Sequence, residues 1–145
     1  MSGAADAQEA KEASRPALSN QEQVDAFFAR LAAGETGEAI DDLYAGHPQI
    51  EALADQVGLL REQFTGLSER VGAYLGGERL AEERISDHFV YLWYLGYFEN
   101  QPLQFHFSFY RPKDRWTLFQ LAYDEALTTL AKVRAKARLA HGDPE

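Results

Sequence analysis

The chain of 145 residues carries 14 basic and 23 acidic side chains, which gives a formal net charge of -9 at pH 7. This surplus of negative charge argues against nucleic-acid binding, because phosphate backbones are repelled. The absence of cysteine excludes disulfides, a thiolate nucleophile and cysteine-ligated zinc. No segment reaches the ~18 consecutive apolar residues of a membrane span, so we expect a soluble protein with no membrane partner.

The length suits one domain. Residues 1–18 are rich in Ala, Glu, Gln and Ser and lack the apolar centre of a signal peptide. We therefore expect a flexible leader at 1–18, a single domain over 19–140 and a short tail at 141–145. The compartment stays open at this stage: cytoplasmic as the chain stands, or periplasmic if an export signal was removed.

Three amphipathic helices are predicted in the first half of the domain. Ser19 and Glu22 form a capping box that begins the first helix. Thr36 is expected to cap a second, short helix, and Pro48 suits the first position of a third helix that fades near Gly66. Apolar residues recur at helical spacing in all three segments: Val24, Phe27, Phe28 and Leu31; Ile40, Leu43 and Tyr44; Ile50, Leu53, Val57, Leu60 and Phe64.

The second half of the domain has the pattern of strands. We expect strands over 71–86, 89–99, 103–111 and 115–123, the first of them bent or bulged at its glycine pair, and a final helix that begins at Asp124. The turns between the last three strands are short, which predicts an antiparallel meander. Helices that precede such a sheet give an α+β fold: N-terminal helices on a curved four-stranded antiparallel sheet, followed by a C-terminal helix.

The aromatic segment from His88 to Pro112 raises the question of function. The third strand alternates cleanly, with Leu103, Phe105, Phe107 and Phe109 on one face and Gln104, His106, Ser108 and Tyr110 on the other. The second strand is apolar on both faces: Phe89, Tyr91, Trp93, Leu95 and Tyr97 on one, Val90, Leu92, Tyr94 and Phe98 on the other.

Three explanations account for a strand that is apolar on both faces. The rings belong to the core, with the second face covered by the C-terminal helix. A second copy of the chain covers that face. Alternatively, the face encloses a cavity in which tyrosine and tryptophan orient a ligand. We favour them in that order.

The order of elements, with the segment "FHFSFYRPKDRWTLFQLAYDEAL" from Phe105 to Leu127, resembles the NTF2-like (cystatin-like fold) superfamily, in particular small uncharacterised bacterial members. The resemblance covers roughly Ser19 to Leu130. It implies a cone in which helices cover a strongly curved sheet. The resemblance implies that an enzyme of the superfamily usually places a carboxylate or a His–Asp pair on the concave sheet face or on a helix above it. The face of Phe105, Phe107 and Phe109 carries no carboxylate here.

Individual residues give little sign of catalysis. His88 and His106 lie on neighbouring predicted strands and, with Asp87, hint at an acid–base cluster, but a surface position is favoured for His106. The four histidines are scattered without metal-ligand spacing, so no metal or other cofactor is expected. Arg111 and Trp116 flank the turn after the third strand, and we expect a cation–π pair between them.

The favoured function is a non-catalytic binding or association module, homodimeric through the sheet. No catalytic residue is assigned, and the interface candidates are Tyr94, His106 and Tyr110. The alternative is a carrier for an apolar small molecule, or a small isomerase-like or dehydratase-like enzyme, with a cavity in the cone. The candidates for lining that cavity are Tyr44, Tyr91, Trp93 and Tyr97.

Overall fold

The computed structural model describes residues 19–141; the predicted leader, and the tail beyond residue 141, lie outside this range. Its helices are α2 (Asn20–Ala32), α3 (Thr36–Tyr44), α4 (Ala54–Val71) and α5 (Leu127–Ala140), and its strands are β1 (Tyr74–Ser86), β2 (Phe89–Phe98), β3 (Pro102–Tyr110) and β4 (Thr117–Asp124). The strands form one antiparallel sheet in the order β1-β2-β3-β4. The predicted α+β fold is thereby confirmed.

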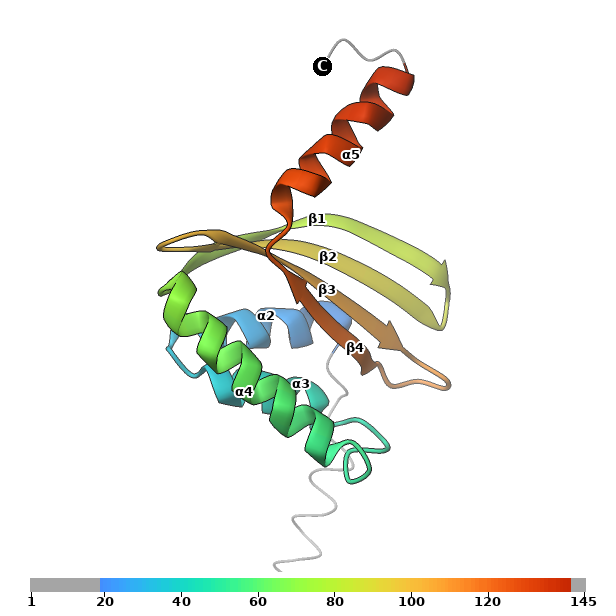
Figure 1. Ribbon diagram of the computed structural model, residues 1–145. Coiled ribbons are helices and arrows are strands. Elements are labelled where there is room, and N and C mark those ends of the chain that lie inside the picture. The colour runs from blue at the N-terminus through green and yellow to red at the C-terminus, as the bar shows by residue number, and fades with distance from the viewer. Residues whose placement is uncertain (1–18, 142–145) are drawn as a thin grey trace, which may run out of the picture.

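The helices divide between the two faces of the sheet. The three N-terminal helices lie together against one face, and α5 rises from the opposite face and points away from it (Figure 1). We call the helix-covered side the inner face and the side from which α5 rises the outer face. Because connections between successive strands are short, the meander places every neighbouring pair of strands side by side.

The N-terminal helices begin partly where the sequence predicts. The capping box is present: the Glu22 amide donates to Ser19 Oγ at 3.1 Å, and the Ser19 amide donates to Glu22 Oε1 at 2.9 Å. Thr36, however, is the first residue of α3 rather than its cap, and the preceding Glu35 makes no side-chain cap.

The third helix begins later than predicted. Residues 48–53 form turns, and α4 starts only at Ala54. The His47 ring accepts a hydrogen bond from the Gln49 amide at 3.0 Å, and such local side-chain bonds compete with helix formation. At its other end α4 passes Gly66 and stops at Gly72, whose φ of 89° only glycine adopts readily.

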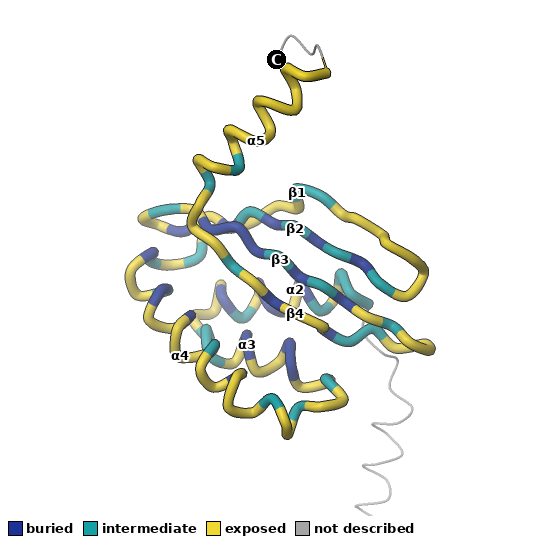
Figure 2. Tube along the Cα trace, turned by 45° about the vertical axis from the view of Figure 1, so that its right-hand side comes forward, coloured by how far each residue is buried: buried dark blue, intermediate teal, exposed yellow. Residues whose placement is uncertain are grey.

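The core lies between these helices and the inner face (Figure 2). Its centre is a group of phenylalanine rings in mostly edge-to-face contact, an arrangement that aromatic quadrupoles favour. For example, the Phe27 ring meets the rings of Phe105 and Phe107 at centroid distances of 5.8 and 5.4 Å. The fully buried rings are Phe27, Phe64, Phe105, Phe107 and Phe109. The predicted inward face of the third strand is therefore confirmed.

Candidate functional site on the outer face of the sheet

The outer face carries a row of apolar side chains along β2. Its members are only half-buried or exposed: Phe89, Tyr91, Trp93, Leu95 and Tyr97. Strand register explains why they share a face, since directly opposite residues of an antiparallel pair point to the same side. Tyr91 pairs with Ser108, Trp93 with His106, and Leu95 with Gln104. We call these five side chains the β2 row.

A chain of hydrogen bonds fixes the centre of this surface. The Trp93 indole N–H donates to Gln104 Oε1 at 2.8 Å, and His106 Nε2 lies 3.1 Å from the same oxygen. An amide oxygen only accepts, so Nε2 carries the imidazole proton and Nδ1 accepts a hydrogen bond from the Tyr91 hydroxyl. Gln104 Nε2 completes the chain at the Ala126 carbonyl, 3.5 Å away.

The pKa of His106 follows from its partly buried position within this chain of hydrogen bonds. Partial burial lowers the pKa of His106, and the nearby Asp124 carboxylate opposes that effect. Burial also raises the pKa of the Tyr91 hydroxyl. The imidazole is therefore neutral near pH 7, and both of its nitrogens are already engaged. This leaves no free ring nitrogen to exchange a proton with a substrate.

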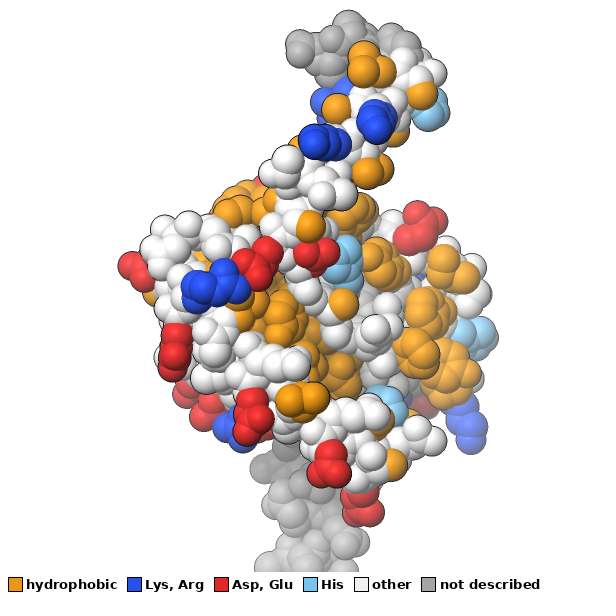
Figure 3. All heavy atoms as spheres, in the orientation of Figure 1, with side chains coloured by type: hydrophobic (Ala, Val, Ile, Leu, Met, Phe, Trp, Pro, Cys, Tyr) orange, Lys and Arg blue, Asp and Glu red, His pale blue; other side chains and the backbone are white. Residues whose placement is uncertain are grey.

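The rim of the outer face is more exposed than its centre. Phe119 on β4 packs edge-to-face against Phe89, with ring centroids 5.7 Å apart, yet 57% of its surface is exposed. Tyr110 is also exposed. At the other end of the row, the Tyr97 hydroxyl donates to Glu78 Oε1. Hydrophobic side chains gather on the sheet surface beside and below α5 (Figure 3).

The segment that leads into α5 is anchored to the rest of the domain. Both terminal nitrogens of Arg70 donate to the Glu125 carboxylate, at 2.8 and 2.9 Å, and Gln101 donates to it at 2.9 Å. The hydrogen bonds from Arg70, and to a smaller extent from Gln101, lower the pKa of Glu125 to about 2. Further along, the Arg134 guanidinium lies 5.2 Å from the Trp93 ring, a cation–π contact that joins α5 to the β2 row.

The residues predicted to line one cavity do not converge. Tyr91, Trp93 and Tyr97 belong to the outer face, whereas Tyr44 is buried in the core, where its hydroxyl accepts from the Leu121 amide at 3.3 Å. A sheet therefore separates Tyr44 from the other three. The alternating pattern of β2 predicts that Tyr91 and Tyr97 share a face of the sheet. It carries no information about the face against which a tyrosine from a distant helix, such as Tyr44, packs.

The predicted interface residues divide in the same way. His106 and Tyr110 lie on the outer face, paired with Trp93 and Phe89. Tyr94 lies on the inner face, buried against Phe28, and donates to Gln21 Oε1 at 2.9 Å. A partner on the outer face therefore has no access to Tyr94.

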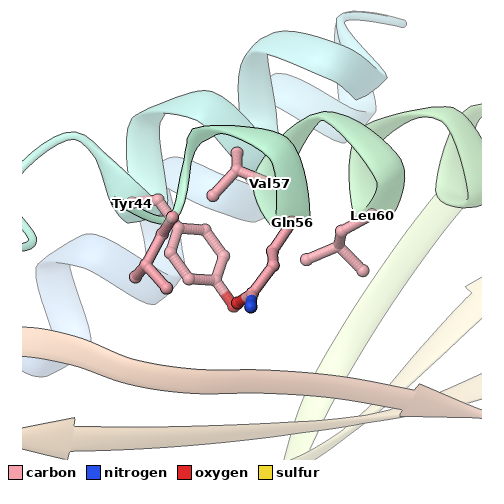
Figure 4. A pocket seen from close by; sticks show the side chains of 5 residues that line it. Tyr44, Gln56, Val57 and Leu60 are labelled. Carbon is pink, nitrogen blue, oxygen red and sulfur yellow. The ribbon is translucent and has the colours of Figure 1, made fainter. Parts of the chain in front are cut away.

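A small pocket lies on the helical side of the molecule. Its volume is about 50 Å³, and its lining residues are Tyr44, Leu53, Gln56, Val57 and Leu60. The Tyr44 hydroxyl and the Gln56 amide group point toward one another in it (Figure 4). Ligand pockets usually hold roughly 300 Å³ or more. This pocket is therefore far too small for a typical small-molecule ligand.

The remaining sequence candidates have structural roles. The Arg111 guanidinium lies 4.7 Å from the Trp116 ring, so the predicted cation–π pair is confirmed. His88 Nδ1 lies 2.7 Å from the Arg111 carbonyl, whereas the His106 ring is hydrogen-bonded to Tyr91 and Gln104. Within residues 19–141, no group of three His, Asp or Glu side chains could hold a metal ion, and no helix is long and apolar enough to cross a membrane.

Sequence reasoning placed Gln104 on this face without finding its role, and it missed Arg134 altogether. Gln104 is buried and links Trp93 and His106 to the start of α5. In the sequence Gln104 appears only as one of the polar residues of the alternating third strand, which gives no sign of this role. Arg134 gave no signal, because its contact with Trp93 depends on the direction in which α5 leaves the sheet.

Comparison with known proteins bears on the fold. No family model matches the chain, and no curated protein matches it at a significant level. A crystal structure of a proposed NTF2-like transpeptidase from Campylobacter jejuni matches with a TM-score of 0.50 and 16% sequence identity, over 69% of this chain and 97% of that one. The chain thus has an NTF2-like fold, as the resemblance implied. At this identity the likeness concerns the fold alone.

Proposed function

We propose that this chain is a non-catalytic association module that forms a homodimer through the outer face of its sheet. The observation that carries the proposal is the β2 row: five large apolar side chains that remain half-buried or exposed on the face opposite helices α2 to α4. An apolar surface of this kind on a folded domain commonly marks an interface. Aromatic residues are also enriched at the centres of interfaces, where they bury much area at a low entropic cost.

The chemistry of the face supports association rather than catalysis. Tyr91, His106 and Gln104 satisfy one another's hydrogen bonds, so that polar groups are paired before any partner arrives. A surface whose polar groups are internally paired can be covered by apolar groups without leaving unsatisfied donors. The same pairing fixes the orientation of the exposed rings, which reduces the entropy lost on binding.

A second copy of the chain is the partner that best fits the charges. The outer face holds Glu78 and Glu83 on β1, opposite Leu95 and Tyr91, while the basic residues of α5 stand on the same side of the sheet. A two-fold interface in which the acidic patch of each copy meets the basic helix of the other pairs opposite charges twice. This surface carries both signs of charge and is therefore self-complementary.

The test is native mass spectrometry combined with sedimentation of the full chain. We expect a dimer for the natural sequence. Phe119→Glu, which places a charge on the exposed rim of the outer face, should shift the population toward monomer, because burying an unpaired carboxylate is costly. The matched control is Leu59→Glu on α4, which adds the same charge at 55% exposure on the helical side and should leave the dimer intact.

Two results would contradict the proposal. A natural chain that is monomeric at all accessible concentrations would show that the β2 row has no second copy to cover it. A monomer that retains a few hundred daltons of additional mass would favour the alternative function, a carrier of an apolar small molecule.

A further inference from the structure

Helix α5 has no buried residue along its 14 positions. Isolated helices of this length are only marginally stable in water, because most helical stability in proteins comes from packing. Its attachments to its own domain lie at its beginning, where Gln104 and Arg70 hold Ala126 and Glu125, and at Arg134 above Trp93. The rest of the helix stands clear of the sheet (Figure 1).

The charge of α5 is opposite to that of the rest of the chain. The helix contains four basic residues, Lys132, Arg134, Lys136 and Arg138, and no acidic one. Since the whole chain has a net charge of -9, the remainder carries -9 minus 4, or -13. Over residues 19–141, no acidic side chain forms an ion pair with any of these four. The surface that electrostatics favour for this helix is an acidic one, such as a second copy provides.

One side of α5 is turned away from its own sheet. Arg134 marks the side that faces Trp93. At about 100° per residue, Lys132 and Lys136 fall on the opposite side, with Val133 and Leu139 at its two edges. Val133 and Leu139 are 60% and 75% exposed. This free side of α5 combines two apolar contacts with two lysines, whose carbon chains can lie on aromatic rings while the ammonium groups reach acidic ones.

Part of the outer face is complementary to the free side of α5, because it combines aromatic rings with an acidic side chain. Phe89, Tyr91, Ser108 and Phe119 lie toward the end of the sheet away from Trp93, with Glu83 opposite Tyr91 on β1. We call these five residues the open half of the outer face. Glu83 has no ion-pair partner among residues 19–141. A helix of about 21 Å is long enough to cross four strands spaced about 4.8 Å apart.

We infer that the two copies exchange their C-terminal helices: α5 of each copy lies across the open half of the outer face of the other. The inference rests on the proposed homodimer. Because α5 rises from the face that forms the dimer, a second copy that approaches that face meets the helix. In the exchanged arrangement Val133 and Leu139 pack on the exposed rings of the other copy, and Lys132 and Lys136 approach its Glu83.

Disulfide trapping tests the exchange directly, since the chain has no cysteine of its own. Two variants of the full chain are mixed, one with Val133→Cys and the other, isotopically labelled, with Ser108→Cys. A disulfide between a labelled and an unlabelled chain is necessarily between copies. The matched control replaces Ser108→Cys by Ser68→Cys, the same half-buried residue type but on α4. We expect at least about 10-fold more mixed disulfide with Ser108→Cys, because proximity within a complex raises the effective concentration.

The outcomes separate the two proposals. A natural chain that is dimeric, with no more trapping at Ser108→Cys than at Ser68→Cys, would overturn the helix exchange and leave the sheet-mediated dimer standing. Trapping only between two Val133→Cys chains would overturn it as well, because the helices would then pair with each other. A monomeric natural chain would overturn the proposed function, and the exchange with it.

A charge exchange provides a second readout. Lys132→Glu combined with Lys136→Glu should weaken the dimer by about 10-fold or more, since like charges then face Glu83 across the interface. Adding Glu83→Lys should restore part of the lost affinity. The same change made alone in the natural background should not strengthen the dimer. If Glu83→Lys restores nothing, the lysines of α5 do not approach this part of the other copy.

Discussion

The two faces of the sheet use the same kinds of residue for different purposes. On the inner face, phenylalanine rings from β3 and two helices exclude water completely and touch one another edge to face. On the outer face, tyrosine, tryptophan and histidine are held by hydrogen bonds through Gln104 and remain half-exposed. Aromatic content therefore does not distinguish a core from a binding surface in this chain. What distinguishes them is whether helices cover the rings.

The largest expected difference between the faces is the effect of removing a ring. Phe107 is fully buried and contacts five other aromatic rings. Phe107→Ala should lower the free energy of unfolding by about 3–5 kcal/mol, through lost burial and the cavity that remains. Phe119→Ala on the outer face should cost under about 1 kcal/mol in a monomer, because the ring is already largely in water. Urea denaturation at low protein concentration measures both. Equal losses would mean that the outer face is part of the core.

Replacing one glycine by alanine on each face compares how tightly the two faces are packed, because the change adds a single methyl group. A Cβ on Gly96 would lie 2.7 Å from Phe105 Cε2 and 3.2 Å from Phe98 Cε2, whereas a Cβ on Gly76 would lie 3.9 Å from Tyr97 Cδ2. Gly96→Ala should therefore destabilise the fold by about 1–3 kcal/mol through overpacking. Gly76→Ala should change the free energy of unfolding by under about 0.5 kcal/mol. Thermal unfolding of the two variants measures both effects. A neutral Gly96→Ala would show that the inner-face rings shift without cost.

The smallest effects concern the hydrogen-bond chain of the outer face. Tyr91→Phe keeps the ring and removes the hydroxyl that donates to His106, and should cost about 0.5–1.5 kcal/mol. Phe89→Leu, which makes no change to the chain of hydrogen bonds, is the control for altered ring packing nearby. Denaturant titration at constant pH measures the difference. If Tyr91→Phe is neutral or stabilising, the hydroxyl contributes nothing to the rigidity of the surface.

Protonation of His106, a member of these hydrogen bonds, makes the free energy of unfolding depend on pH in a defined window. Because burial lowers the pKa of His106 below its ordinary 6.5, the folded protein binds fewer protons than the unfolded chain just below that pH. The free energy of unfolding should therefore decrease as the pH falls through 6.5 toward the lowered value, and His106→Gln should remove that part of the decrease. Denaturation of both proteins between about pH 7.5 and 5.5 tests this. The loss linked to Glu125, whose pKa is lowered from 4.5 to about 2, belongs to more acidic solutions and does not interfere.

Much of the fold follows from the sequence because it depends on local patterns. Alternation along residues 103–110 predicts a strand with one buried face, and the capping box at Ser19 predicts where α2 begins. Short turns between strands predict the meander and hence the order of the sheet. These features involve residues close together in the chain, where steric fit and backbone hydrogen bonding act without help from distant elements.

Other features were decided only by the tertiary structure. The sequence shows that β2 is apolar on both faces, but not which face the helices cover, because that depends on how the sheet curves and on where α2 to α4 pack. It places Tyr44 on a helix without showing that the sheet separates it from Tyr91. It predicts a C-terminal helix without its direction, which depends on Arg70, Gln104 and Trp93 at its base. The sequence by itself determined the elements and their amphipathic patterns; contacts between residues far apart in the chain decided which aromatic side chains became core and which remained a surface.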